Sequence, residues 1–169
     1  SVPAFVVDEG YRWMLTACAL RAQHRFGDAL AAAHEAVSHG RTPARLLVLA
    51  DTQKHAGDLA AAITTLERLL EMDAHHATGL AQLAGYRNIA GAPEEGARVF
   101  ARFRAVADDS AACHRDAAFY FATRGELVGV VNALSRALAL EAEATRGYIA
   151  DEVELDRFRQ EETLRALLA

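Results

Sequence analysis

The sequence predicts an all-α protein, an α-solenoid of about four helical hairpins closed by a C-terminal capping helix. Three observations support this fold class. Gly57, Gly91 and Gly125 recur at a constant spacing of 34 residues, and each lies between two amphipathic segments. Alanine is abundant while proline is scarce, with 3 prolines in 169 residues. No stretch alternates apolar and polar residues as an exposed strand does, so we expect nearly all of the chain to be helical.

The chain begins with an extension, residues 1–9, whose apolar run from Ser1 to Val7 is too short for a helix of its own. This run either packs on the first hairpin or joins a preceding domain. We also expect weak homodimerisation through Ser1 to Asp8. The first hairpin, residues 10–42, is one residue shorter than the others and carries His24 where they place glycine. Its inner turn therefore departs from the common pattern.

The second hairpin, residues 43–76, shows the pattern most clearly. Its two helices are predicted over Ala44 to His55 and Leu59 to Met72, because apolar residues recur there at helical spacing. Gly57 can adopt the positive φ that ends a helix, and Asp58 can cap the N-terminus of the next one. The segment is therefore predicted to form two helices joined by a tight turn.

The third hairpin covers residues 77–110 and the fourth covers residues 111–144. Pro93 opens the second helix of the third hairpin, at a position where the missing N–H costs no hydrogen bond.

Residues 145–169 begin the pattern once more and then depart from it. Glu152 stands where a small residue is needed, inside an acidic run that lacks the spaced oxygen ligands of a calcium loop. A terminal hairpin needs a polar outer face, because no neighbour covers it. We therefore predict that Leu155 to Leu168 forms an amphipathic capping helix.

Residues of one size recur at fixed positions of the hairpins. Small residues stand at position 8, where two helices can cross closely: Ala17, Ala50, Ala84 and Ala118. Position 4 favours larger side chains: Trp13, Leu46, Leu80, His114 and Tyr148. Over roughly residues 10–150 this pattern resembles the tetratricopeptide repeat (TPR), a helix-turn-helix unit of the same period. The leucine- and arginine-bearing C-terminus also resembles the tails of bacterial repeat proteins.

The resemblance implies a concave groove lined by the first helix of each hairpin. In the TPR family a partner peptide or helix is contacted from positions 2, 5, 9, 12 and 13. The candidate groove residues at these positions are Tyr11, Met14, Arg21, Leu47, Asp51, Lys54, His55, Asn88, Arg115 and Phe119. Apolar anchors beside cations suit an extended peptide or an amphipathic helix with some negative charge.

One family activity is not expected. The TPR clamp that grips the C-terminal carboxylate of heat-shock chaperones needs lysine, asparagine and arginine at five positions. These positions hold Met14, Cys18, Val48, Thr78 and Gln82. We therefore expect no binding of chaperone tails.

Charge and composition exclude further classes. A net charge of -5 argues against general nucleic-acid binding, which needs a basic face. No apolar run approaches the ~18 residues of a membrane span. Cys18 and Cys113 lie in the first and fourth hairpins, too far apart for a disulfide. The sequence shows no signal peptide; a cytoplasmic location is favoured, and the periplasm stays open.

The chain carries no glycine-rich phosphate loop, no nucleophile motif and no cysteine pair at zinc spacing. We therefore expect no cofactor, no metal and no catalysis. The function hypothesis is a non-enzymatic scaffold that binds another protein. The alternatives are an accessory or regulatory domain of a larger enzyme, a secretion-type chaperone and, last, an enzyme within this chain.

Overall fold

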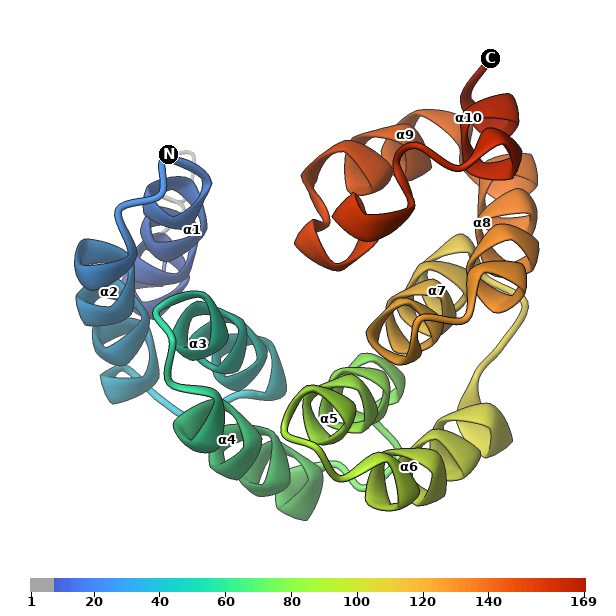
Figure 1. Ribbon diagram of the computed structural model, residues 1–169. Coiled ribbons are helices and arrows are strands. Elements are labelled where there is room, and N and C mark those ends of the chain that lie inside the picture. Colours follow the sequence, from blue (N-terminus) through green and yellow to red (C-terminus); the bar gives the residue numbers. More distant parts are fainter. Residues whose placement is uncertain (1–7) are drawn as a thin grey trace, which may run out of the picture. The chain divides into compact units, whose positions relative to one another are not determined.

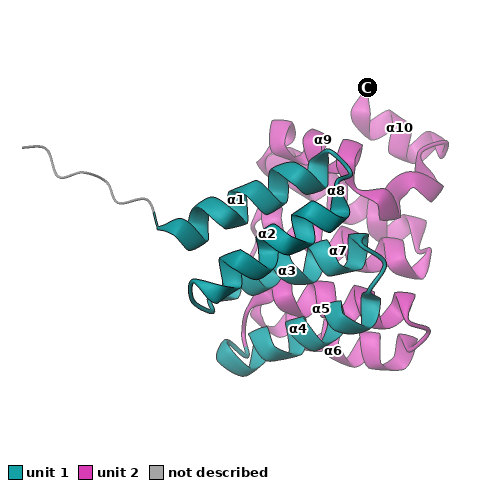
Figure 2. Ribbon diagram, turned by 90° about the vertical axis from the view of Figure 1, so that its left-hand side faces the viewer, with its two compact units in different colours: residues 1–74 teal, residues 75–169 magenta. Residues whose placement is uncertain are grey.

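The computed structural model describes residues 8–169. The chain divides into two compact units, residues 1–74 and residues 75–169, called unit 1 and unit 2 below (Figure 2). The predicted dimerisation segment, Ser1 to Asp8, lies outside the described residues except for Asp8. Within residues 8–169 the regular structure is helical throughout, which confirms the all-α solenoid fold class.

The helices follow one another as antiparallel hairpins within each unit (Figure 1). The helices of unit 1 are α1 (Glu9–Ala22), α2 (Phe26–Ser38), α3 (Pro43–His55) and α4 (Leu59–Met72). Those of unit 2 are α5 (Ala77–Ile89), α6 (Pro93–Val106), α7 (Ala111–Arg124), α8 (Leu127–Leu140), α9 (Ala142–Asp151), the 3₁₀ helix η1 (Val153–Phe158) and α10 (Glu162–Leu168). Each hairpin packs its first helix on its second, and α1 with α3 and α5 with α7 also lie side by side.

The small residue at position 8 is buried in every one of the four hairpins. The position-8 alanines are fully buried, with 0% exposure: Ala17, Ala50, Ala84 and Ala118. Gly96 faces Ala84 across the α5–α6 crossing, and a Cβ added to Gly96 would lie 2.7 Å from the Ala84 carbonyl oxygen. The backbones therefore approach closely enough to exclude side chains there, and larger buried residues such as Leu66 and Leu134 fill the space beside the crossings.

A residue with positive φ ends the first helix of each hairpin. Gly57, Gly91 and Gly125 have φ values of 90°, 81° and 74°. His24 takes this place in the first hairpin with φ of 58°, at a cost of roughly 1 kcal/mol that glycine would avoid. The turn keeps its hydrogen bonds even so, because Arg25 N–H donates to the Leu20 carbonyl at 3.0 Å.

Polar side chains and Pro93 define where helices begin. The Asp58 carboxylate accepts from Ala61 N–H at 2.9 Å, and the Ser110 hydroxyl accepts from Cys113 N–H at 3.2 Å. Pro93 is the first residue of α6. Each satisfies or removes an N–H that the first helical turn leaves without a partner.

A buried arginine ties the start of α1 to the loop before α3. The Arg45 guanidinium donates to the carbonyls of His39 at 3.0 Å and Gly40 at 2.9 Å, and it pairs with the Asp8 carboxylate. Gly10 lies directly beneath it, because any Cβ at that position would overlap the guanidinium. Asp8 therefore has a structural role in unit 1, as the partner of a buried cation.

Trp13 does not pack as its position predicts. The position-4 residues Leu46 and Leu80 are buried, but Trp13 is 39% exposed. Within the described residues, α1 packs extensively only on α2 and α3, so its remaining side has no helix to cover it. The repeat pattern thus predicts the residue type at this position correctly and its burial wrongly.

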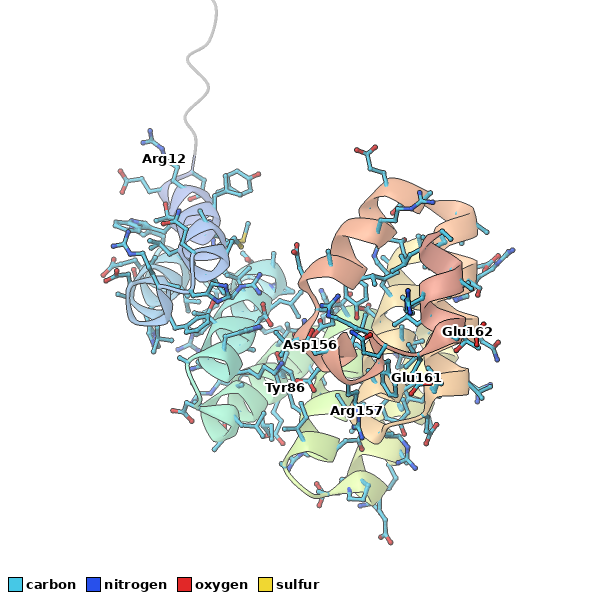
Figure 3. The ribbon with its side chains drawn as sticks, turned by 45° about the horizontal axis from the view of Figure 1, so that its top comes forward. Arg12, Tyr86, Asp156, Arg157, Glu161 and Glu162 are labelled. Carbon is cyan, nitrogen blue, oxygen red and sulfur yellow. The ribbon has the colours of Figure 1, made fainter. Side chains whose placement is uncertain are left out.

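The C-terminal segment is broken where one capping helix was expected. The break falls at Arg159, whose guanidinium donates to the carbonyls of Ile149 and Ala150 at 2.9 Å each and so caps the end of α9. Leu155 and Leu164 are buried, since η1 packs on α7 and α10 packs on α8. Other charged side chains of the segment are exposed, among them those labelled in Figure 3: Asp156, Arg157, Glu161 and Glu162.

Two glycine substitutions test the packing of unit 2. Gly85 faces the Phe119 ring so closely that a Cβ would overlap it, whereas Gly147 on α9 has no atom within 4 Å of a new Cβ. We expect Gly85→Ala to lower the free energy of unfolding by about 1–2 kcal/mol, and Gly147→Ala to raise it by about 0.5–1 kcal/mol. Urea denaturation of the two variants measures both changes. Stabilisation by Gly85→Ala would contradict the packing described here.

Candidate functional site

The candidate groove residues of unit 1 lie along one side of α1 and one side of α3. On α1, Tyr11 is 48% exposed, while Met14 and Arg21 are half-buried. The α3 residues are half-buried: Leu47, Asp51, Lys54 and His55. Spacings of three and four residues place each set in a single stripe along its helix. Because α1 and α3 pack side by side, the two stripes form one continuous face, called the α1–α3 face below.

The Asp51 carboxylate is the centre of the charges on the α1–α3 face. Arg21 Nη1 lies 2.8 Å from Asp51 Oδ2, which links α1 to α3. His55 Nδ1 donates to the Asp51 backbone carbonyl at 2.8 Å and lies 3.4 Å from Asp51 Oδ1. The structure thus brings Arg21, Asp51 and His55 together, three residues that the sequence could assign only to the same groove.

The pKa values of this cluster favour its charged form. Burial by itself would raise the pKa of Asp51, but the hydrogen bond with His55 and the charges of Arg21, His55 and Lys54 hold it below the ordinary value. The hydrogen bond with Asp51 raises the pKa of His55, although burial opposes the change. One carboxylate therefore lies among two permanent cations and a histidine that binds a proton more readily than usual. The face carries an excess of positive charge.

The three candidate residues of unit 2 are engaged within the chain. Asn88 Nδ2 donates to Thr123 Oγ1 at 2.9 Å, across the α5–α7 contact. Arg115 Nη1 contacts Glu141 Oε2 at 3.0 Å and Thr145 Oγ1 at 3.2 Å. These contacts join neighbouring helices, so both side chains hold unit 2 together.

Phe119, expected as an apolar anchor of the groove, is 7% exposed. Its ring occupies the space beside Gly85 and meets the Tyr86 ring edge to face, with 6.0 Å between the centroids. The expectation of an accessible anchor therefore needs correction: Phe119 is a packing residue between α5 and α7. Gly85 has no side chain to keep the ring out.

Sequence reasoning missed a carboxyl group between α5 and α7. Asp116 Oδ2 accepts a hydrogen bond from the Thr78 hydroxyl at 2.8 Å. Burial raises the pKa of Asp116 to about 6, although Thr78 and the charge of Arg115 act against this. The neighbouring Tyr148 hydroxyl is buried with no hydrogen-bond partner among the described residues, and burial raises its pKa as well. An aspartate at one position of an amphipathic helix gives no sequence signal of such burial.

Residues 8–169 contain no cluster of three or more histidine, cysteine or acidic side chains arranged to hold a metal ion. In the same part of the chain, no helix combines the length and the apolar character needed to cross a bilayer.

Stacked hairpins with alanine crossings define an α-helical repeat protein. No protein-family model matches the chain, and no curated protein matches its sequence. Solved structures do match. The crystal structure of TTC0263, a thermophilic TPR protein of Thermus thermophilus, superposes with a TM-score of 0.69 at 21% identity, over 94% of this chain and 87% of that one.

Two structures of MamA are also similar, both at 14% identity and a TM-score of 0.57. The double mutant "MamA RS-1 ArsTM" matches over 96% of this chain and 92% of its own. "MamA 41-end" from Desulfovibrio magneticus RS-1 matches over 91% of this chain and 98% of its own. The chain has the fold of the TPR protein TTC0263, so the TPR resemblance is confirmed at the level of the fold.

Asp116→Asn tests the half-buried carboxyl group between α5 and α7. The pKa of Asp116 lies above its ordinary value of 3.8, so the folded state binds the proton more tightly than the unfolded chain. Stability should therefore fall as the pH rises from about 4 through 6. Asparagine keeps an acceptor for Thr78 without the charge, and we expect it to raise the free energy of unfolding at pH 7.5 by roughly 1–3 kcal/mol.

Urea denaturation of wild type and Asp116→Asn at pH 4.5 and pH 7.5 measures this difference. The gain should shrink at pH 4.5, where the wild-type carboxyl is already protonated in the folded state. A gain of equal size at both pH values would show that the charge of Asp116 is not its cause.

Proposed function

We propose that this protein is a non-enzymatic scaffold that binds a peptide or helical segment of another protein on the α1–α3 face. TPR-fold neighbours support the general class of helical-repeat scaffold. The observation that carries the specific proposal is the cluster of Arg21, Asp51 and His55. Lys54 lies on the same face, whereas Arg115, the charged candidate residue of unit 2, is held by Glu141 and Thr145.

The chemistry of the face indicates the chemistry of its partner. Tyr11, Met14 and Leu47 offer accessible apolar surface, and aromatic and methionine side chains are favoured where proteins meet. Beside them, Arg21, Lys54 and His55 outnumber the single carboxylate. A segment that carries apolar side chains next to Asp or Glu matches both properties. This surface charge is local, because the whole chain carries a net charge of -5.

Peptide display tests the proposal directly. We expect a random peptide library selected on the immobilised full chain to yield sequences with acidic and large apolar residues. Binding of the selected peptides should weaken about tenfold in Tyr11→Ala, which removes apolar contact surface. It should also weaken about tenfold in Lys54→Gln, which removes a cation. Fluorescence anisotropy gives the affinities.

Matched controls come from unit 2, where Val128→Ala removes an exposed apolar side chain and Arg98→Gln removes an exposed cation. Neither should change affinity by more than twofold. Selected peptides that bind the double variant Tyr11→Ala with Lys54→Gln as tightly as wild type would refute the α1–α3 face as the site.

The same peptides should bind more weakly as the pH rises. The pKa of His55 is raised, so the histidine is charged at pH 6 and loses its proton as the pH passes above its ordinary value of 6.5. We expect affinity for an acidic peptide to fall about threefold between pH 6 and pH 8.5 in wild type. In His55→Gln this fall should disappear. An identical pH profile in both proteins would exclude a role for His55.

A further inference from the structure

Unit 1 contains a cleft formed by α2, α3 and α4, and its lining residues differ from those of the α1–α3 face. Its volume is about 310 Å³, which is at the small end of ligand-binding pockets. Val37, Leu49 and Met72 give it apolar walls, and Arg41 and Arg68 line it with cations. The α3 residues here differ from those of the α1–α3 face, because they lie on another side of the helix.

A buried polar pair lies in this α2–α4 cleft. Thr65 Oγ1 donates to Gln53 Oε1 at 2.8 Å, and both residues are buried. Because Oε1 accepts this bond, the amide nitrogen of Gln53 keeps its two N–H donors for another acceptor. The cleft therefore offers donors beside an apolar wall.

The equivalent positions of unit 2 hold different side chains, and they can be compared with those of the cleft. Thr42 caps α3 as Ser110 caps α7, and these two residues are 68 positions apart. The same interval relates Arg41 to Asp109, Gln53 to Phe121 and Arg68 to Arg136.

In unit 2 the residues at these positions have partners within the unit. Arg136 Nε donates to Asp109 Oδ1 at 3.1 Å, so the arginine has a carboxylate of its own. Phe121 packs edge to face on Phe100, with 5.4 Å between the ring centroids. An aromatic side chain thus stands at the position that Gln53 has in unit 1.

At the equivalent positions unit 1 has two arginines, because Arg41 stands where unit 2 has Asp109. Within the described residues, neither Arg41 nor Arg68 makes an ion pair, and both are exposed. His34 and Glu71 also line the cleft, so its two arginines face a single acid. Two cations lining one partly apolar cleft lack the counter-charge that Asp109 supplies in unit 2.

We propose that the α2–α4 cleft binds an acidic side chain of a partner peptide, with its carboxylate held by Arg41 and Arg68. Arginine is suited to this role, because its planar fork can donate two hydrogen bonds to one carboxylate. An aliphatic residue beside the acid packs on Leu49 and Met72. The cleft is a second binding site, on a different side of unit 1 from the α1–α3 face.

A fluorescein-labelled peptide of alternating leucine and glutamate, blocked at both ends, is the probe. Its affinity for the full chain is measured by fluorescence anisotropy. Arg41→Gln and Arg68→Gln should each weaken binding about tenfold, since each removes a charge-assisted hydrogen bond. A peptide with serine in place of leucine should also bind more weakly, because it leaves the apolar wall uncovered.

Arg41→Asp gives the sharpest test, because it builds in unit 1 the pair that Asp109 and Arg136 form in unit 2. In the double variant Tyr11→Ala with Lys54→Gln, which disables the α1–α3 face, adding Arg41→Asp should abolish detectable binding while the melting temperature stays equal or rises. Arg136→Gln is the matched control and should keep wild-type affinity within twofold.

Unchanged affinity in Arg41→Asp, an equal loss in Arg136→Gln, or no binding of the probe at 1 mM would each overturn the proposal. A loss caused by Lys54→Gln and Tyr11→Ala, but not by Arg41→Gln or Arg68→Gln, would also overturn it. In that case the α1–α3 face would hold the peptide and the proposed scaffold function would stand.

Discussion

The close crossing of two helices at a small residue is the constraint on which the structure depends. At the α5–α6 crossing the Ala84 carbonyl leaves no room for a Cβ on Gly96, and Ala17, Ala50 and Ala118 are as fully buried as Ala84. Backbones that approach so closely align the neighbouring ridges and grooves, so the larger apolar side chains pack beside the crossing. In unit 1 the positions on one side of α1 and of α3 lie outside this packing and stay partly exposed. They can carry charge, and these are the positions on which the candidate binding face is built.

The two units are built from similar helical hairpins but differ in how their arginines are paired with acidic side chains. In unit 2, Arg115 is paired with Glu141 and Arg136 with Asp109. These pairs join successive helices and leave little charge for a partner. Unit 1 gathers cations around Asp51, and the two arginines of its α2–α4 cleft form no ion pair within residues 8–169. Exposed ion pairs contribute little stability, so their loss costs the fold little and makes charge available for recognition.

The fold could be predicted from the sequence because its determinants are local and repeated. The alanine crossings and the glycines with positive φ recur at a fixed interval, and each follows from a short-range rule. The candidate site depends instead on what lies across from a residue. Helical spacing placed Phe119 on an inward side, but only the structure shows that Gly85 leaves room for its ring. Spacing also gives no sign that Asp116 meets Thr78, or that Arg159 folds back to cap α9.

Both candidate sites lie in unit 1 because of the geometry of α3. This helix packs against α1, α2 and α4, so two of its sides border different neighbours. Residues at spacings of three and four share a side, which places Asp51 and Lys54 toward α1 and Leu49 and Gln53 toward α2 and α4. The buried Ala50 contributes to neither surface. Separate substitutions can therefore alter each site, and their effects on binding can be compared.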